Sequence, residues 1–182
     1  RSKDRFRLTD SGTFWFSNSP WKPSTHWGNK ILRICTWVRL EEVSSGGSFY
    51  VYNLHLDHLS QLSRQKSAEL LAKEISRRPS GDPFVVLGDF NAKIDNPAML
   101  YLQQIGYQSP CPRLVDSWQM LYRAEKDAGT FHGFKGGLSG PKIDYVLVSD
   151  DTDIIEVGID RREFGGRYPS DHFPVYAEIK LY

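Results

Sequence analysis

The sequence predicts a mixed domain of the α/β (α+β) class, in which strands outnumber helices and most strands pair antiparallel. Several segments alternate apolar and polar residues with a period of two, which is typical of half-buried strands. One longer segment repeats its apolar residues at helical spacing. The chain has 182 residues, of which 40% are hydrophobic and 13% aromatic. This amount of apolar material fits the core of a single domain spanning residues 1–182.

Two neighbouring segments in the first third of the chain predict a β-hairpin. Residues 31–40 alternate over ten positions, and residues 48–56 alternate again. Residues 44–47 read Ser-Ser-Gly-Gly, which is a turn sequence, so we expect the two strands to pair. In the second strand, Asn53 and His55 point to the same face.

The next segments predict helices and a buried strand. Residues 60–78 have apolar side chains at i, i+3, i+4 and i+7, and a proline and a glycine follow, so they predict the one long helix. Residues 84–87 are a short run of aromatic and β-branched residues, which predicts a buried strand. A short helix is expected over 97–105, because a proline stands at its start and a glycine lies just beyond its end.

The C-terminal part predicts more strands than helices. Residues 114–126 have a weaker helical pattern. Residues 129–141 contain five glycines, so we expect a loop there. Three further strands are expected over residues 142–149, 154–160 and 173–181.

The charge distribution excludes some classes of protein. The net charge of +1 excludes a histone-like or polybasic nucleic-acid binder. The longest apolar run, at 98–102, is far shorter than the roughly 20 residues that a membrane span needs. Residues 1–40 carry a net charge of +6 and the remainder −5. The basic N-terminal part either meets a phosphate or is a solvated surface.

Cysteine usage and the start of the chain leave the compartment open. Cys35 and Cys111 are too few for a disulfide framework, and one bridge or two free thiols both fit. The chain begins at Arg1 without Met or an apolar leader. We therefore expect a processed chain, a fragment or an excised domain, and the sequence does not indicate its oligomeric state.

Polar side chains stand where the predicted strands end. Asp89 and Asn91 follow the buried run at 84–87, and the glycine before them lets the backbone turn. Asp171 and His172 stand side by side just before the last strand. Each of these motifs, taken alone, is also common as a turn with bonds from side chain to backbone.

Asp144 adds a carboxylate in an unusual position. It shares a strand face with Val146 and Val148, where an ionised carboxylate is costly unless it is paired or bound to metal. With the residues above, the strand ends collect three carboxylates, an amide and two histidines. Oxygen-rich sites of this kind suit Mg²⁺ or Mn²⁺ more than zinc.

Four short motifs occur in order along the chain: NLHLD at 53–57, GDFNA at 88–92, IDY at 143–145 and SDH at 170–172. In these motifs the sequence resembles the endonuclease/exonuclease/phosphatase superfamily. The resemblance implies a deoxyribonuclease-like four-layer α/β/β/α sandwich. The chain looks like the C-terminal two-thirds of that domain, with the N-terminal portion missing. The resemblance also implies a metal-dependent phosphoesterase that cleaves a phosphodiester or a phosphomonoester with an activated water.

The resemblance implies roles for individual residues. Asp89 and Asn91 would position or activate the attacking water and orient the phosphate. His172 would contact the scissile phosphate or transfer a proton, and Asp144 would hold His172 in the tautomer that it needs. His55 would bind the phosphate in the transition state.

Three further residues are implied at the metal and at the substrate. Asp171 would be a carboxylate of the metal site, with Mg²⁺ or Mn²⁺ as the cofactor. Arg33 falls where such enzymes place a phosphate-binding basic group, and His132 lies in a loop that lines the site in close relatives. The substrate would be a phosphate ester in a nucleic acid, a nucleotide, a phosphoinositide or a phospholipid headgroup.

Several alternatives stay open. The family's strand with a metal-binding Glu has no counterpart upstream of Thr13, so the chain could be an inactive fragment or a binding module that retains the fold. NLHLDH at 53–58 is one residue short of the His-x-His-x-Asp-His motif of zinc hydrolases of the metallo-β-lactamase type. Trp15, Trp21 and Trp27 could stack on a base or a sugar, or pack in the core. Strands that would pack on missing ones should expose apolar side chains.

Overall fold

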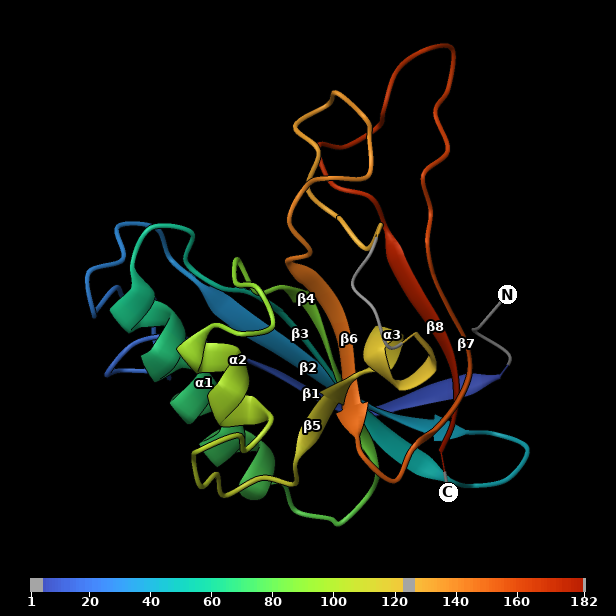
Figure 1. Ribbon diagram of the computed structural model, residues 1–182. Coiled ribbons are helices and arrows are strands. Elements are labelled where there is room, and N and C mark those ends of the chain that lie inside the picture. Colours follow the sequence, from blue (N-terminus) through green and yellow to red (C-terminus); the bar gives the residue numbers. More distant parts are fainter. Residues whose placement is uncertain (1–4, 123–126, 182) are drawn as a thin grey trace.

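A six-stranded sheet is the centre of the molecule, which we describe from a computed structural model for residues 5–122 and 127–181. Its strands are β1 (Phe6–Trp15), β2 (Ile34–Glu42), β3 (Ser48–His55), β4 (Phe84–Asp89), β5 (Leu114–Asp116) and β6 (Asp144–Ser149). They lie in the order β1-β2-β3-β4-β6-β5 (Figure 1). β3 and β4 run parallel, whereas the other neighbouring pairs of this sheet are antiparallel, which confirms the predicted hairpin of β2 and β3.

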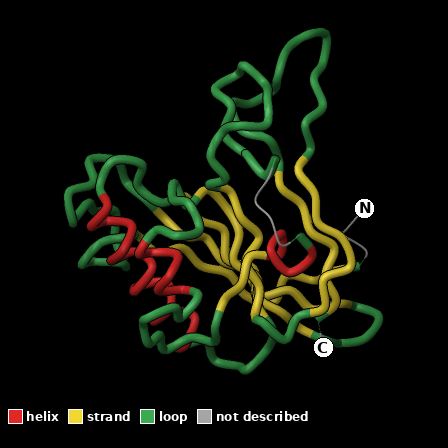
Figure 2. The backbone as a smooth tube through the Cα atoms, viewed as in Figure 1, coloured by secondary structure: helices red, strands yellow, loops and turns green. Residues whose placement is uncertain are grey.

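Two helices, α1 (Gln61–Ser76) and α2 (Pro97–Leu102), lie together on one face of this sheet (Figures 1 and 2). The side chains of Ser60 and Asn96 cap them, each accepting a hydrogen bond from a backbone N–H of the first turn. Each cap satisfies a donor that the helix itself leaves unpaired. The two predicted helices are therefore confirmed, although both end earlier than expected.

The main hydrophobic core lies between the sheet and these helices. Tyr52 and Leu54 of β3 pack there with Leu71 and Ile75 of α1, and all four are buried. Burying side chains of this size contributes about 1.5–3 kcal/mol each. The exposed His55 lies on the opposite face of β3, so the predicted division of this strand into two faces is confirmed.

A second sheet of two strands packs on the other face of the main sheet. It pairs β7 (Asp153–Ile159) antiparallel with β8 (Val175–Lys180). Apolar side chains of both strands fill a smaller core against Val85 and Val146. The short helix α3 (Ser117–Leu121) lies beside β6 and β7. Helices, main sheet and second sheet therefore form successive layers, as the deoxyribonuclease-like fold implies.

The second sheet leaves part of the main sheet uncovered. Leu8 of β1 is 58% exposed and Ile34 of β2 is 40% exposed. Both lie on the face opposite Cys35, which is buried in the main core. In the part of the chain that the structure describes, no helix has the length and apolar character needed to cross a membrane.

Some element predictions were wrong. No strand was predicted at β1, because most of its side chains are exposed and a register shift between Leu8 and Asp10 interrupts its alternation. The prediction of a helix over 114–126 was wrong at its start, because residues 114–116 form the strand β5, which pairs with β6. Only α3 is helical within the described part of that range, and residues 123–126 lie outside the described residues. Pairing between distant segments overrides local propensity there.

Candidate active site

The candidate site lies at one edge of the main sheet, where β3 and β4 end and β6 begins. Because β3 and β4 are parallel, their carboxyl ends meet at this edge, and the antiparallel β6 starts beside them. The register pairs His55 with Asp89, and Asp89 with Asp144. Three neighbouring strands therefore deliver one polar side chain each to the same edge.

Gly88 allows β4 to approach β3 closely where the site begins. Its φ is +133°, and a Cβ atom on it would lie 2.0 Å from the carbonyl oxygen of Leu54. A residue with a side chain does not fit so small a gap. Gly88 thus sets the pairing from which Asp89 leaves the sheet, and the buried Phe90 anchors the turn that follows.

Asp89 and Asn91 form a tight turn, and hydrogen bonds from Asn91 fix the carboxylate of Asp89. The backbone N–H of Asn91 donates to Oδ1 of Asp89 over 2.7 Å, and Nδ2 of Asn91 donates to Oδ2 of Asp89 over 3.2 Å. The same Nδ2 also donates to the carbonyl oxygen of Leu56 over 3.0 Å. Both hydrogens of the Asn91 amide are therefore engaged within the protein. The amide oxygen is the group that Asn91 offers to a ligand.

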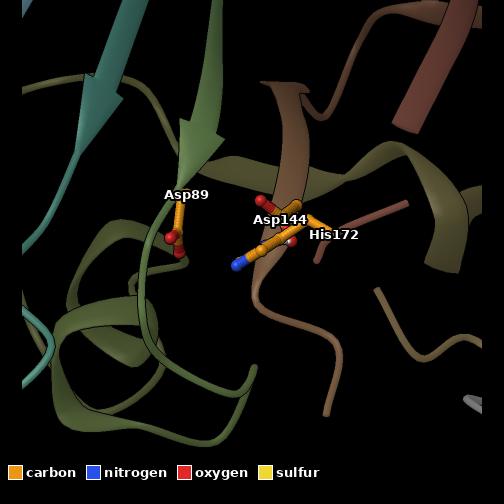
Figure 3. A group of neighbouring side chains, drawn as sticks. All are labelled: Asp89, Asp144 and His172. Atoms are coloured by element: carbon orange, nitrogen blue, oxygen red, sulfur yellow. Dashed lines mark hydrogen bonds and ion pairs between the residues drawn. The ribbon is translucent and has the colours of Figure 1, made fainter. Parts of the chain in front are cut away.

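Asp144 and His172 form a hydrogen-bonded pair opposite Asp89. Oδ2 of Asp144 lies 2.8 Å from Nδ1 of His172, and the other ring nitrogen points toward Asp89 (Figure 3). Burial lowers the pKa of His172, but the hydrogen bond and charge of Asp144, with other nearby carboxylates, outweigh burial and raise this pKa overall. The pair therefore shifts the imidazole toward its doubly protonated form.

Thr130 connects the two members of this pair, although the sequence analysis did not select it. Its Oγ1 accepts hydrogen bonds from the backbone N–H groups of Ile143, over 3.0 Å, and Asp144, over 3.2 Å. Its carbonyl oxygen accepts a hydrogen bond from the N–H of Phe173 over 2.8 Å. Because Thr130 is fully buried, it fixes the start of β6 relative to the segment that carries His172.

His55 approaches the same carboxylate from β3. Its Nε2 lies 3.2 Å from Oδ2 of Asp89. Burial lowers the pKa of His55, the positive charge of Arg33 lowers it further, and the charge of Asp89 opposes these effects only in part. His55 therefore favours its uncharged form, in contrast to His172.

Asp89, Asp144 and His172 form a group that could hold a divalent cation, because their ligand atoms lie within 4.8 Å of one another. All three line a cavity of about 290 Å³. Burial, together with the charge of Asp144, raises the pKa of Asp89, and a cation would relieve this crowding of carboxylates. Two carboxylates and the nearby amide oxygen of Asn91 fit a hard ion that retains water. The group contains one histidine, unlike the histidine-rich zinc motif.

Two other predicted residues form the wall beside His172. The backbone carbonyl oxygen of Asp171 accepts a hydrogen bond from the N–H of His132 over 2.9 Å. The carboxylate of Asp171 is not one of the three clustered ligands. His132 stacks on Phe173 with 3.9 Å between the ring centroids. His132 is therefore built into the loop that supports the site, and it is largely buried.

Arg33 is turned inward. Its Nε lies 3.7 Å from Oδ2 of Asp57, and its side chain is 9% exposed. Its Nη2 lies 3.0 Å from Nδ1 of His58, whose side chain is exposed. In the sequence, His58 stands out only through its likeness to a zinc motif, whereas in the structure its ring bonds to Arg33.

The tryptophans that could stack on a ligand lie elsewhere. Trp21 and Trp27, with Trp37, line a groove of about 730 Å³ beside α1. Nε1 of Trp27 donates a hydrogen bond to Asn18 over 2.8 Å. Trp15 lines neither this groove nor the cavity beside Asp89, and the two cavities have no lining residue in common.

Comparisons with known proteins connect this geometry to one family. A sequence model of the Endonuclease/Exonuclease/phosphatase family matches residues 2–172. The mannosyl-6-phosphatase Bt3783 of Bacteroides thetaiotaomicron has a similar structure, with a TM-score of 0.84 and 28% identity, over 98% of this chain and 68% of its own. A conserved protein of unknown function from Enterococcus faecalis has a TM-score of 0.83 and 26% identity, over 99% of this chain and 69% of that protein.

More distant matches add less. The catalytic domain of human nocturnin superposes with a TM-score of 0.73 at 18% identity, over 99% of this chain and 61% of that one, and shows a similar fold alone. An uncharacterized protein of Acanthamoeba polyphaga mimivirus is 36% identical over 81 residues. This match covers 42% of this chain and 30% of the viral protein.

Proposed function

The chain belongs to the endonuclease/exonuclease/phosphatase family, and from this premise we propose that it is a metal-dependent phosphoesterase in which a water activated at Asp89 attacks phosphorus. The observation that supports this most is the meeting of Asp89 with the Asp144–His172 pair, with ligand atoms within 4.8 Å. Phosphoester hydrolysis needs a base for the water and stabilisation of charge on the phosphoryl oxygens. Asp89 offers the base, and the Asp144–His172 pair offers the stabilisation of charge.

Asp89 is the proposed base. It stands just beyond a buried strand, and Asn91 holds both of its oxygens in a fixed orientation. Its raised pKa makes it a better proton acceptor than an ordinary carboxylate. The water oxygen forms a bond to phosphorus and its proton passes to Asp89. The bond from phosphorus to the alcohol oxygen breaks, and that oxygen takes a proton from solvent.

His172 is the proposed donor to the phosphoryl group. Nδ1 of His172 donates to Asp144, and in the doubly protonated form, which the raised pKa of His172 favours, Nε2 carries a second hydrogen that faces the space beside Asp89. A charged N–H at this place stabilises the negative charge that builds up on phosphoryl oxygens. Asp144 acts through His172, as a positioning residue.

The proposed metal site draws on oxygens of Asp144, Asp171 and Asn91, and Asp89 and His172 lie beside the ion as base and donor. Oxygen ligands suit Mg²⁺ or Mn²⁺. Such an ion, when bound, neutralises charge on the phosphate and lowers the pKa of a bound water. His55, uncharged and beside Asp89, and His132, in the supporting loop, are proposed to shape the phosphate site. Arg33 is too buried to bind phosphate directly and is proposed to act through its charge.

The first substrate to test is a sugar phosphomonoester, because the chain is similar to a mannosyl-6-phosphatase of Bacteroides thetaiotaomicron. Nucleotides, phosphoinositides, phospholipid headgroups and nucleic acids complete the panel. The competing function is a binding module that retains the fold without catalysis, and the same panel distinguishes the two.

The test is release of inorganic phosphate from mannose 6-phosphate and the panel, with Mg²⁺ and after chelation. We expect Asp89→Asn and His172→Ala each to lower kcat by about 10²-fold or more, the scale for a positioned acid or base. Asp95→Asn is the matched control, because Asp95 is an exposed aspartate in the segment that follows Asp89. Full activity of Asp89→Asn would contradict the mechanism. Absence of turnover by the wild type on every ester would favour the binding module.

A further inference from the structure

Beside the candidate active site, three side chains form a series that leads from a buried charge to an exposed imidazole. The side chains of Asp57 and Arg33 are 2% and 9% exposed, and they form an ion pair 3.7 Å apart. Oδ1 of Asp57 also accepts hydrogen bonds from the N–H groups of Leu59 and Ser60. Nη2 of Arg33 lies 3.0 Å from Nδ1 of the exposed His58. Arg33 is therefore fixed on one side and bonded to His58 on the other.

This arrangement determines which nitrogen of His58 carries the hydrogen. A guanidinium group has donors and no acceptor, so Nδ1 of His58 has to accept the hydrogen bond from Arg33. A neutral imidazole with a lone pair on Nδ1 carries its hydrogen on Nε2. His58 thus presents an N–H donor at Nε2. In the Arg33–His58 pair Nδ1 accepts a hydrogen bond, whereas in the Asp144–His172 pair Nδ1 donates one to a carboxylate.

The backbone places His58 at the catalytic edge but on the side away from His172. The N–H of Leu56, two residues earlier, donates to the carbonyl oxygen of Asp89 over 2.8 Å, and Asn91 bonds to Leu56 in return. Arg33 directly precedes β2, which is two strands from β4 in the sheet. At strand spacing this is on the order of 10 Å from Asp89. An ester whose phosphate lies between Asp89 and His172 has to extend over about that distance, from β4 toward β2, to reach His58.

We propose that His58 donates a hydrogen bond from Nε2 to an oxygen in the alcohol part of the substrate, such as a sugar hydroxyl, and that Arg33 is the positioning residue that fixes this tautomer. This inference rests on the proposed function and adds a substrate class to it, namely esters whose alcohol carries hydroxyl groups. The phosphate itself is bound elsewhere, so His58 distinguishes between alcohols and leaves the chemical step unchanged.

The positioning of His58 is tested without substrate, from its ring-nitrogen chemical shifts in the metal-free protein. In the wild type we expect a lone pair on Nδ1 and a hydrogen on Nε2. In Arg33→Lys the ammonium keeps the charge beside Asp57 but lacks the planar fork that reaches two partners. We expect the tautomer preference to be lost. Arg39→Lys is the matched control, since Arg39 of β2 pairs with Asp82 over 2.7 Å, and it should leave His58 unchanged.

The contact with the alcohol is tested by comparing mannose 6-phosphate with phenyl phosphate, whose alcohol part has no further hydroxyl. We expect His58→Ala to lower kcat/KM for mannose 6-phosphate about tenfold, the scale of one hydrogen bond, and to leave phenyl phosphate within about twofold. His58→Gln can donate from a nearby position and should recover most of the loss. The dissociation constants of both esters should change in the same ratios, and this readout needs no turnover.

The outcomes separate this inference from the proposed function. A hydrogen on Nδ1 in the wild type, or an unchanged tautomer in Arg33→Lys, overturns the positioning role. If His58→Ala lowers kcat/KM equally for both esters, or for neither, the proposed contact between His58 and the alcohol part is overturned. A wild type that turns over no ester of the whole panel overturns the proposed function. Tautomer and binding measurements then still decide the role of His58.

Discussion

The two halves of the candidate site are built in different ways. The sheet half consists of Gly88, Asp89 and Asn91, which follow one another along the chain at the end of β4. The loop half consists of Thr130, Asp144 and His172, which are far apart in the sequence. Thr130 and His172 lie in loops, and hydrogen bonds connect these loops to Asp144 at the start of β6. A strand and one turn fix the first half. Contacts across 13 to 43 residues of sequence fix the second.

This difference has a physical consequence for how each half fails. The sheet half depends on backbone packing that leaves no room for a Cβ atom, so a change there disturbs the main sheet. The loop half depends on a few hydrogen bonds, each of which contributes about 1 kcal/mol. We expect a side chain at Gly88 to destabilise the fold, and changes in the loop half to misplace His172 in a folded protein.

The largest expected effect is that of Gly88→Ala. Its Cβ atom would meet the Leu54 carbonyl oxygen at 2.0 Å, in a backbone conformation that only glycine adopts readily. We expect the free energy of unfolding to fall by at least about 3 kcal/mol, measured by urea denaturation. Gly81→Ala is the control, because a Cβ atom there meets nothing within 4 Å. Equal stability of the two variants would contradict the close approach of β3 and β4.

Thr130→Val should have a smaller effect, on catalysis as well as stability. The change keeps the shape of the side chain but leaves the N–H groups of Ile143 and Asp144 without their acceptor. We expect a loss of about 2 kcal/mol in stability and about tenfold in kcat, with KM little changed. Thr130→Ser retains the hydroxyl and should recover most of both. If Thr130→Ser and Thr130→Val have the same stability and kcat, the hydroxyl of Thr130 does not position the Asp144–His172 pair.

The sequence could predict the sheet half because its determinants are local. A buried run, a glycine and two polar residues two apart lie within eight residues, and GDFNA carries the family resemblance. Strand alternation likewise predicted that Asn53 and His55 share one face of β3, and both are exposed there. The strand β1 escaped prediction because its exposed side chains and its register shift remove the period-two pattern.

Of the loop half, the resemblance implied the pairing of Asp144 with His172 but not the contacts that hold the pair. Asp144 and His172 stood out because a carboxylate on an apolar face needs a partner. Thr130 has no local signal, since its role depends on a backbone 13 residues away. The burial of Arg33 was missed for the same reason, because Asp57 and His58 lie more than 20 residues further along the chain.

The smallest expected effect is a pH dependence within the loop half. The pKa of His172 is raised in the folded protein, so the folded state binds this proton more tightly than the unfolded chain does. The resulting stability is fully present below the unfolded pKa of about 6.5 and is lost as the pH rises through the folded value. In metal-free protein, Asp144→Asn should therefore cost more stability at about pH 5.5 than at about pH 9. A cost that does not vary with pH would show that the pair does not hold a proton.

The central claim is that the two halves act on one phosphate, and a double-mutant cycle in kcat tests it most directly. Asp89→Asn removes the base of the sheet half, and His172→Ala removes the donor of the loop half. Residues that act as a unit are strongly non-additive. We predict that the double variant retains the kcat of the slower single variant to within about threefold. A loss equal to the product of the two single losses would contradict the claim, because it would mean that the two halves act independently.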